Sequence, residues 1–434
     1  MPPEVEEDGI FLPSTACRMV QTGRGKESGS IEWHRSIACC VALMPSHASV
    51  VFEPPATGKP GTHVLIVGIG DYPHLLGGDQ EQTALAENMG QLTTPSPSAR
   101  ALAAWFLDEF RNADKELASL ALVLSEKAPA TFTHPRALAA APLPRGTANE
   151  VVDAIQAWVE RSSTNIDNQV IFFFCGHGVS TSEPILLLRD FARNKLQRFF
   201  GALNLNGFLG AMQTMMPTDQ LFLIDACQTP TSVAQLTFGL PHLGQNALDP
   251  SSLDDRGGTP ARQSVHHATS SLARAFGRVD GRSLYTDALI QALNGGGATS
   301  DFRWWVGTPG LQTALGAYVD RLARKEKVIQ EPERVQNARF KIHRPARIQV
   351  PLYVTSDPKE ALLVARVEAR LEGVVKAAYD HNTMTPCEEW PALLDHREHQ
   401  IAVRFDPRSG YRDVEETLQV APPELPHTLL VRTP

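Results

Sequence analysis

The chain has 434 residues, which is long for one domain and comfortable for two. Its apolar content of 42% and charged content of 20% are typical of a soluble globular protein. The net charge of −8 gives no basic footprint, which argues against nucleic-acid binding, and no apolar run approaches the roughly 18 residues of a membrane span.

The six cysteines form no CxxC pairs and show no regular spacing. This pattern argues against both a disulfide framework and a zinc site, and it suits a reducing compartment. We therefore expect a cytoplasmic protein that binds no metal through its cysteines.

The N-terminal 60 residues lack the regular apolar pattern of the rest of the chain. Residues 1–35 show no sustained period, and the apolar run from Ile37 to Met44 is short and lies late for a signal peptide. An ordered pattern begins only after Pro60. The sequence thus predicts a disordered or mis-called extension over residues 1–60, with Met44 as an alternative start to Met1.

From residue 61 onward, short apolar runs alternate with amphipathic stretches. Such runs predict buried strands, which we expect at 63–69, 117–124, 170–175, 184–188 and 221–224. We expect helices at 99–111 with Ser98 as cap, at 148–161 behind a capping box from Thr147 to Glu150, at 203–215, within 281–293 with Thr286 as cap, and at 310–324. Residues 264–276 read as a strand or the start of a helix. This alternation predicts an α/β fold with a mostly parallel sheet flanked by helices.

Two of the expected strands stop abruptly at reactive side chains. VIFFFCGHG ends on His177 and Gly178, and LFLIDACQT carries Cys227 about fifty residues later. Open α/β sheets bind ligands at the carboxyl ends of their strands. If the two strands are neighbours, an imidazole and a thiol enter one crevice, as a Cys-His nucleophile pair requires.

The paired segments resemble the caspase-like cysteine proteases, which include caspases, metacaspases, paracaspases and bacterial relatives. The shared pattern is a strand into His-Gly and, about fifty residues on, a strand into Asp/Gln-x-Cys. Asp225 and Thr229 stand where animal caspases have Gln and Gly, which points to the metacaspase and bacterial branches. The resemblance covers roughly residues 60–335 and implies a caspase-like peptidase domain over 61–340.

The proposed chemistry gives each residue of the motif a role. Cys227 would attack the scissile carbonyl, and His177 would generate the thiolate or protonate the leaving amine. The N–H groups of Gly178 and Cys227 would form the oxyanion hole. Caspase-like enzymes are usually described as dyads, and no third member is evident. Cys175 is expected in the core, and two further histidines are expected to be surface or structural residues, namely His266 and His267.

Two acidic residues are candidates for substrate binding. In metacaspases and related enzymes the acidic residue two before the Cys, here Asp225, lines the pocket for the residue before the cut. A carboxylate there suits Arg or Lys. Asp71, on the loop after the first strand, is either a second acidic wall or an ordinary turn residue or helix cap.

A loop rich in Gly, Pro, Asp and Ser follows Cys227 over residues 228–263. Long loops inside compact domains are usually functional or disordered. In the caspase family this place holds an activation linker that is often cut, so Arg256 and Arg262 are candidate autocleavage sites. The alternative is an ordinary flexible loop.

The pattern of apolar and polar residues changes again from about Arg344. Short apolar runs separated by polar and Pro-containing turns predict a small β-sandwich-like accessory domain over 344–434, in which 361–371 reads as strand or helix. It carries no evident chemistry. We expect it to bind a regulatory partner, to pack on the protease or to sense a trigger.

These observations predict a cysteine endopeptidase that cleaves proteins after Arg or Lys. The resemblance implies a regulated role in bacterial cell death, defence or signalling. It also raises calcium activation as in metacaspases, although the sequence has no EF-hand loop, and no other cofactor is expected. The alternatives are a catalytically silent caspase-like scaffold, or a transpeptidase or amidase that uses the same dyad.

Overall fold

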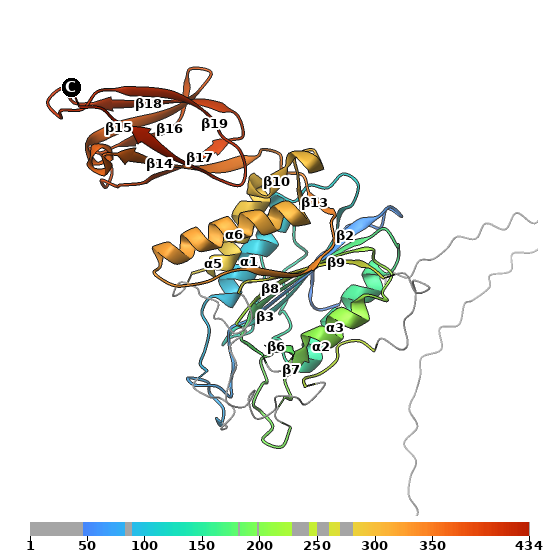
Figure 1. Cartoon of the computed structure of the whole chain (residues 1–434). Coiled ribbons are helices and arrows are strands. Elements are labelled where there is room, and N and C mark those ends of the chain that lie inside the picture. Colours follow the sequence, from blue (N-terminus) through green and yellow to red (C-terminus); the bar gives the residue numbers. More distant parts are fainter. Residues whose placement is uncertain are drawn as a thin grey trace, which may run out of the picture. The chain divides into compact units, whose positions relative to one another are not determined.

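The computed structural model describes residues 47–82, 89–180, 183–197, 199–227, 243–249, 260–269 and 281–433. Residues Ser46–Pro434 form one compact unit. Its centre is a seven-stranded sheet, drawn in Figure 1.

The central sheet has the order β1-β3-β2-β4-β8-β9-β12. Its five inner strands run parallel and its two edge strands run antiparallel to their neighbours. The strands are β1 (Val50–Phe52), β3 (Glu116–Ser125), β2 (Gly61–Ile69), β4 (Gln169–Gly176), β8 (Asp219–Ala226), β9 (Arg262–His267) and β12 (Glu333–Asn337). The mostly parallel α/β sheet predicted from the alternating pattern is confirmed.

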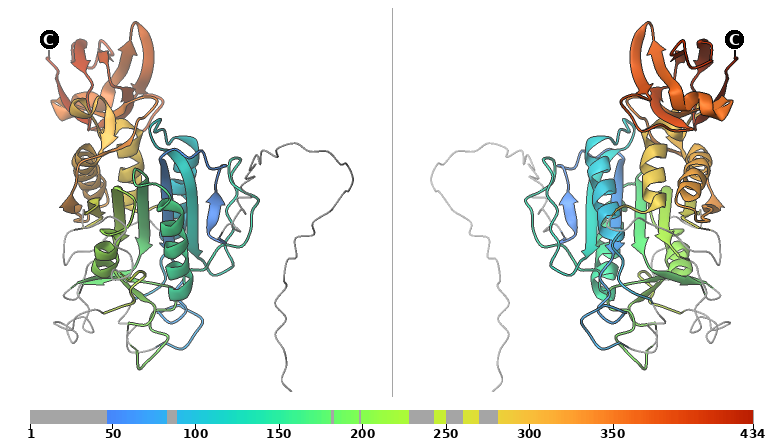
Figure 2. Two further views of the ribbon diagram at one scale, coloured as in Figure 1. Left: turned by 90° about the vertical axis from the view of Figure 1, so that its right-hand side faces the viewer. Right: turned by 90° about the vertical axis from the view of Figure 1, so that its left-hand side faces the viewer.

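Helices cover both faces of this sheet, as Figures 1 and 2 show. One face carries α1 (Pro95–Asp108), α5 (Leu284–Gln291) and α6 (Thr308–Lys325), and the other carries α2 (Ala148–Ser162) and α3 (Leu205–Met212). Side chains along β2 alternate between the two cores: Val64 and Ile66 pack with α1, whereas Leu65 and Val67 pack with α2. None of the helices in the described part of the chain has the length and apolarity to cross a membrane.

Two helix starts differ from the predicted ones. Thr94 precedes α1 with Pro95 in its first turn, and the predicted cap Ser98 lies inside the helix, where its hydroxyl accepts a bond of 3.0 Å from the N–H of Ser283. Ser283, not Thr286, caps α5. Proline favours the first helical position, so Pro95, and not Ser98, indicates where α1 begins. The capping box of α2 is present as predicted.

The N-terminal boundary lies earlier than predicted. Strand β1 pairs antiparallel with β3, with Val50 opposite Ala121. Residues 50–52 therefore belong to the sheet and not to an extension that reaches residue 60. A three-residue strand is too short to show a period, which is why the sequence did not reveal it. Residues 1–46, Met44 included, lie outside the described residues.

Two small sheets and several short helices lie outside the central sheet. A three-stranded antiparallel sheet follows β4 and contains β5 (Gly178–Ser180), β6 (Pro184–Leu187) and β7 (Ala202–Asn204), so the helix predicted from 203 begins instead after a strand. A second small sheet contains β10 (Ala298–Thr299), β11 (Trp305–Gly307) and β13 (Lys341–His343). The described residues also form the short helices η3 (Ala292–Gly296), η4 (Ser300–Phe302) and η5 (Lys359–Val364).

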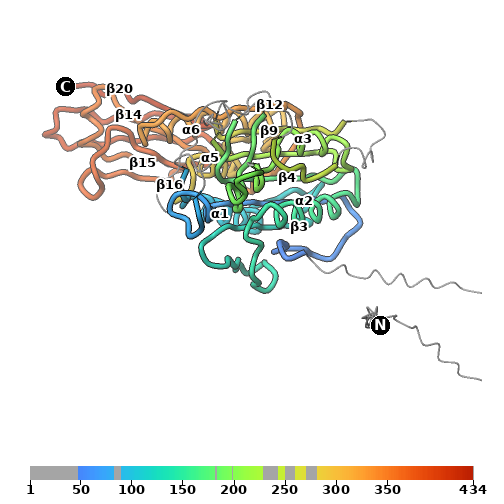
Figure 3. Tube along the Cα trace, turned by 90° about the horizontal axis from the view of Figure 1, so that it is seen from below, coloured from blue at the N-terminus to red at the C-terminus, as the bar shows by residue number. Residues whose placement is uncertain are grey.

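The C-terminal segment forms two β-sheets around one apolar core. One sheet has the order β17 (Trp390–Asp395), β14 (Gln349–Asp357), β20 (Leu425–Leu430), and the other β16 (Val374–Asp380), β15 (Ala365–Leu371), β18 (Glu398–Phe405), β19 (Val414–Gln419). Figure 3 follows this chain to its end, where β20 lies beside β14. The ambiguous stretch 361–371 divides into the end of η5 and β15, and β17 was not predicted.

Helix α6 contacts this C-terminal β-domain through two side chains. The guanidinium of Arg321 lies 3.5 Å from the ring centre of Tyr353 and pairs with Glu389 at 3.0 Å and Glu424 at 3.2 Å. The hydroxyl of Tyr318 donates to the carbonyl of Pro423. A stacked and paired arginine fixes a geometry more strongly than an isolated surface ion pair does.

Candidate active site

Adjacent strands deliver the predicted dyad to one edge of the sheet. In the parallel β4–β8 ladder, Cys175 lies opposite Asp225 and Gly176 opposite Ala226. His177 and Cys227 are the next residues on the two strands, so they leave the sheet side by side at its carboxyl edge. This edge is where open α/β sheets place their sites.

Gly178 lies against the backbone of the cysteine segment. A Cβ atom added at Gly178 would lie 2.5 Å from the carbonyl oxygen of Cys227 and 3.0 Å from Cβ of Ala226. Only a residue without a side chain permits this approach without a shift of the backbone. The structure therefore brings together His177, Gly178 and Cys227.

The imidazole of His177 is held by a backbone carbonyl. Its Nε2 lies 2.8 Å from the carbonyl oxygen of Gly90. Because a carbonyl only accepts, Nε2 carries the proton, and the neutral ring keeps its lone pair on Nδ1. The half-buried ring has lost solvent, and this desolvation lowers the pKa of His177 from its ordinary value more than the bond to Gly90 raises it. The imidazole is therefore neutral near pH 7 and has the protonation state of a base.

Tyr72 holds His177 through a hydrogen bond and a ring contact. It is fully buried, its hydroxyl accepts from the N–H of His177 at 2.8 Å and donates to the carbonyl of Leu187 at 3.2 Å, and the Tyr72 and His177 rings lie 4.9 Å apart. The side chain of Gln91 in turn bonds both the N–H and the carbonyl of Tyr72, at 2.8 and 2.9 Å.

These supporting residues were missed by sequence reasoning. Tyr72 was visible only as part of the loop after the first strand. Gly90 acts through its carbonyl, which every residue has, so no side-chain pattern could have revealed it.

Asp225 is a buried carboxylate held by neutral donors. It is 3% exposed and accepts from the hydroxyls of Ser283 and of Thr286, the latter at 3.2 Å, and from the thiol of Cys175 at 3.4 Å. Burial raises its pKa to about 6, although these donors lower it. Within the described ranges no arginine or lysine pairs with it, so the charged form lacks a counter-charge.

Cys175 has a structural place, as predicted. It is buried in the core beside α5, and burial followed by the charge of Asp225 raises the pKa of its thiol well above the ordinary value. A thiol held protonated in this way is a poor nucleophile and serves here as a donor.

His266 and His267 lie in β9 and are buried rather than on the surface. His266 bonds Ser264 and Gln312, each at 2.9 Å. Burial lowers the pKa of His266 to about 3 and that of His267 to about 4. Both are neutral structural residues at neutral pH.

Asp71 does not lie free as an acidic wall. Its carboxylate is 2.7 Å from Arg189 and 3.8 Å from Arg145, and its carbonyl accepts from Ser125 at 2.6 Å. Since its charge is already matched by arginine, the structure favours the alternative reading of Asp71 as a structural residue of the loop that leaves β2.

The structure also argues against Arg262 as a cleavage site. It is the first residue of β9, lies opposite Asp219 of β8 and pairs with it at 2.6 Å. Gln263, on the other side of the bond that would be cut, is buried at 3% exposure. A peptide bond inside a ladder is not presented to a protease, so the predicted loop ends at residue 261. Arg256 lies outside the described residues.

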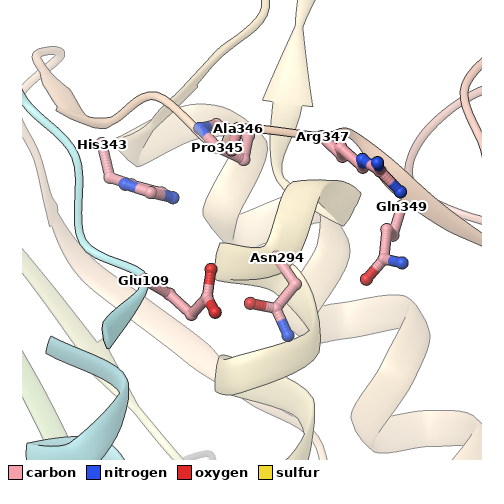
Figure 4. A pocket seen from close by; sticks show the side chains of 7 residues that line it. All are labelled: Glu109, Asn294, His343, Pro345, Ala346, Arg347 and Gln349. Atoms are coloured by element: carbon pink, nitrogen blue, oxygen red, sulfur yellow. The ribbon is translucent and has the colours of Figure 1, made fainter. Parts of the chain in front are cut away.

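A separate cavity of about 340 Å³ lies away from these residues. It is lined by Glu109, Asn294, His343, Pro345, Ala346, Arg347 and Gln349 (Figure 4). It contains none of the predicted site residues. Among the residues that the structure describes, no group of three or more His, Cys, Asp or Glu side chains could hold a metal ion.

Comparison with known proteins gives two findings. A family model described as a caspase domain matches residues 62–343, which is more than half of the chain. The chain is also similar to an uncharacterised protein, y4kE, of Sinorhizobium fredii (strain NBRC 101917 / NGR234), with 26% identity over 193 residues. That match covers 43% of this chain and 52% of the relative, so the chain spans about half the length of the curated relative it matches.

Proposed function

The chain belongs to the caspase-domain family of cysteine peptidases, and on that premise we propose that it is an active endopeptidase with a His177–Cys227 dyad. One observation carries the proposal. The β4–β8 register delivers an imidazole of defined tautomer and a thiol to the same edge of the sheet. The close packing of Gly178 on Cys227 supports it.

The reaction proceeds in two steps. Nδ1 of His177 takes the thiol proton, and the thiolate sulfur bonds to the scissile carbonyl carbon, while the N–H groups of Gly178 and Cys227 stabilise the oxyanion. Collapse breaks the C–N bond, and His177 passes its proton to the departing amine. Water, deprotonated by the same imidazole, then attacks the thioester and releases the acid product and the thiol.

Asp225 would select a basic residue before the cut. A buried carboxylate with only hydroxyl and thiol donors costs free energy that a cation would recover. A substrate Arg or Lys supplies that cation, and Arg adds a bidentate geometry. Ser283, Thr286 and Cys175 all donate to the Oδ2 atom of Asp225, and the substrate cation would pair with the carboxylate beside these donors.

Asp225→Asn is expected to abolish the preference for Arg and Lys. Asn keeps an acceptor oxygen for Ser283 and Thr286 but removes the charge, so kcat/KM for Arg peptides should fall about 10²–10³-fold. Fluorogenic peptides that differ only in the residue before the cut (Arg, Lys, Gln or Asn) measure this. Asp71→Asn is the matched control, since its partners are arginines of the chain itself, and Arg should stay preferred. Unchanged Arg cleavage by Asp225→Asn would refute the assignment.

The pH dependence of alkylation and of peptide cleavage should distinguish the roles of His177 and Asp225. The lowered pKa of His177 keeps its base form at pH values below the ordinary 6.5, so alkylation of Cys227 by iodoacetamide should persist there. Asp225, with its pKa raised to about 6, becomes neutral as pH falls through 6, so kcat/KM for Arg peptides should drop in that range. Cys227→Ala protein corrects the alkylation for the other thiols. Parallel loss of both signals above pH 6.5 would contradict these assignments.

We propose that the enzyme cuts itself after Arg256. Arg256→Gln should stop the nicking of purified protein, whereas Arg262→Gln should leave it unchanged, because Arg262 lies in β9. Mass spectrometry of the fragments gives the cut position. Equal nicking of Cys227→Ala protein would show that another protease is responsible.

A catalytically silent scaffold is the second candidate. Its support is the burial of Asp225, which is only 3% exposed. Labelling by a peptide electrophile discriminates, since only an active dyad modifies Cys227 rapidly and irreversibly. We likewise propose a regulated context, a cytoplasmic location, calcium activation and a partner for the C-terminal β-domain. Assays with and without calcium test the calcium activation.

A further inference from the structure

The carbonyl that holds His177 lies outside the central sheet, on the connection between β2 and α1. Gly90 meets Leu76 there in an isolated β-bridge, and the N–H of Leu76 donates to the carbonyl of Met89 at 3.0 Å. A single bridge fixes a backbone less firmly than the long ladders of the sheet do. The place of the Gly90 carbonyl therefore depends on what else ties this segment to the sheet.

The side chain of Gln91 provides such a tie. Its Oε1 accepts from the N–H of Tyr72 at 2.8 Å, and its Nε2 donates to the carbonyls of Tyr72 at 2.9 Å and Leu76 at 3.1 Å. An amide side chain has the donor and the acceptor of a peptide group, so Gln91 pairs with the backbone of Tyr72 as a neighbouring strand would. These three bonds start from the residue directly after Gly90.

Tyr72 is itself firmly anchored. Its side chain is fully buried in the apolar core. The residue before it, Asp71, bonds Ser125 at the end of β3 twice: its N–H donates to the carbonyl of Ser125 at 3.1 Å, and its carbonyl accepts from the hydroxyl at 2.6 Å. The hydroxyl of Tyr72 also accepts from the N–H of His177 at 2.8 Å. Gln91 is therefore bonded to the residue that holds the backbone of His177, and it adjoins the residue that holds the imidazole.

We propose that Gln91 is a positioning residue of the candidate active site. Its amide places the carbonyl of Gly90 against Nε2 of His177. The bonded Nε2 keeps its proton, and the lone pair on Nδ1 stays available to Cys227. Without the amide, the carbonyl is free to shift and the ring to turn. The inference rests on the proposed dyad and adds the residue that orients its base.

Gln91→Ala should lower kcat for the best-cleaved fluorogenic peptide about 10-fold and leave KM unchanged. The loss is smaller than that of a dyad residue, because the backbone bond from Leu76 to Met89 remains. Gln91→Glu is the second variant. It keeps the length of the side chain and an acceptor for Tyr72, but its carboxylate cannot donate to the two carbonyls, so kcat should fall here too.

Gln80→Ala is the matched control. Gln80 lies on the same connection at an exposed position, and its side chain bonds the neighbouring Asp79 at 3.5 Å. Its removal should leave kcat unchanged.

NMR of protein with isotope-labelled histidine rings separates positioning from a general loss of structure. The bond to Gly90 should slow the exchange of the Nε2–H of His177 with water and so give a proton–nitrogen signal, which is assigned by its absence from His177→Ala protein. The signal should disappear in both Gln91 variants and persist in Gln80→Ala protein, with similar Tm values for all three.

Four results decide the matter. Wild-type kcat together with an unchanged Nε2–H signal in both Gln91 variants would overturn the proposal, and so would an equal loss in Gln80→Ala protein. A lower kcat with the signal intact would also overturn it, because the imidazole would then still be held. If the wild-type protein hydrolyses no peptide, the proposed dyad fails, and the Nε2–H signal alone still decides whether Gln91 positions His177.

Discussion

Replacing Cys227 by alanine should abolish peptide hydrolysis, with kcat/KM for Arg peptides falling by at least about 10⁴-fold. The sulfur is the atom that bonds to the substrate carbon, and loss of a nucleophile leaves only the residual effect of oxyanion stabilisation and binding. Initial rates on matched fluorogenic peptides measure the effect. The protein should fold normally, because Cys227 follows the last residue of β8 and lies outside the apolar cores.

Cys387→Ala is the matched control for the loss of a thiol. Cys387 is half-buried in the C-terminal β-domain, so its removal should leave both activity and labelling unchanged. A peptide electrophile should modify wild-type protein at Cys227 and at no other cysteine. Cleavage that survives in Cys227→Ala protein would overturn the dyad.

Gly178→Ala should reduce kcat/KM by about 10²-fold. The new Cβ would lie 2.5 Å from the carbonyl oxygen of Cys227, so the two strand ends must move apart. Displacing reacting groups by a fraction of an ångström to one ångström costs catalysis heavily. The same rate assay measures the loss, with thermal unfolding to report on the fold.

Gly316→Ala is the control for a generic glycine substitution. Gly316 lies within α6, and a Cβ there meets no atom within 4 Å. Alanine is the better helix former, so this variant should be stabilised by about 0.5–1 kcal/mol with activity unchanged. Full activity in Gly178→Ala protein would show that the packing of Gly178 on Cys227 is not needed for the reaction.

The strands that carry the proposed dyad could be predicted because they are continuous apolar runs that end at a polar residue. β2, β4 and β8 are buried along their whole length, so each reads as an unbroken hydrophobic segment. The capping box of α2 was equally clear, because two side chains satisfy the helix start reciprocally.

The missed features depend on contacts between distant residues. Ser98 looks like a cap but bonds the N–H of Ser283, 185 residues away. Gly90 holds His177 through a carbonyl that has no sequence signature. Asp71 looked available until Arg189, on a distant loop, proved to be its partner. Local patterns indicate where a strand ends, whereas the partners of a side chain follow from tertiary packing.

The central sheet continues across the segment that follows Cys227. β8 and β9 pair in parallel from Asp219↔Arg262 to Ile224↔His267, and β12 joins beyond. Six register pairs and the shared core of α1, α5 and α6 hold the two sides together without the connecting chain. A cut after Arg256 would therefore leave the two fragments in one particle, and the nicked protein should elute as a single species until it is denatured. The covalent backbone at that point would then provide connectivity during folding, and the nicked protein should keep its fold without it.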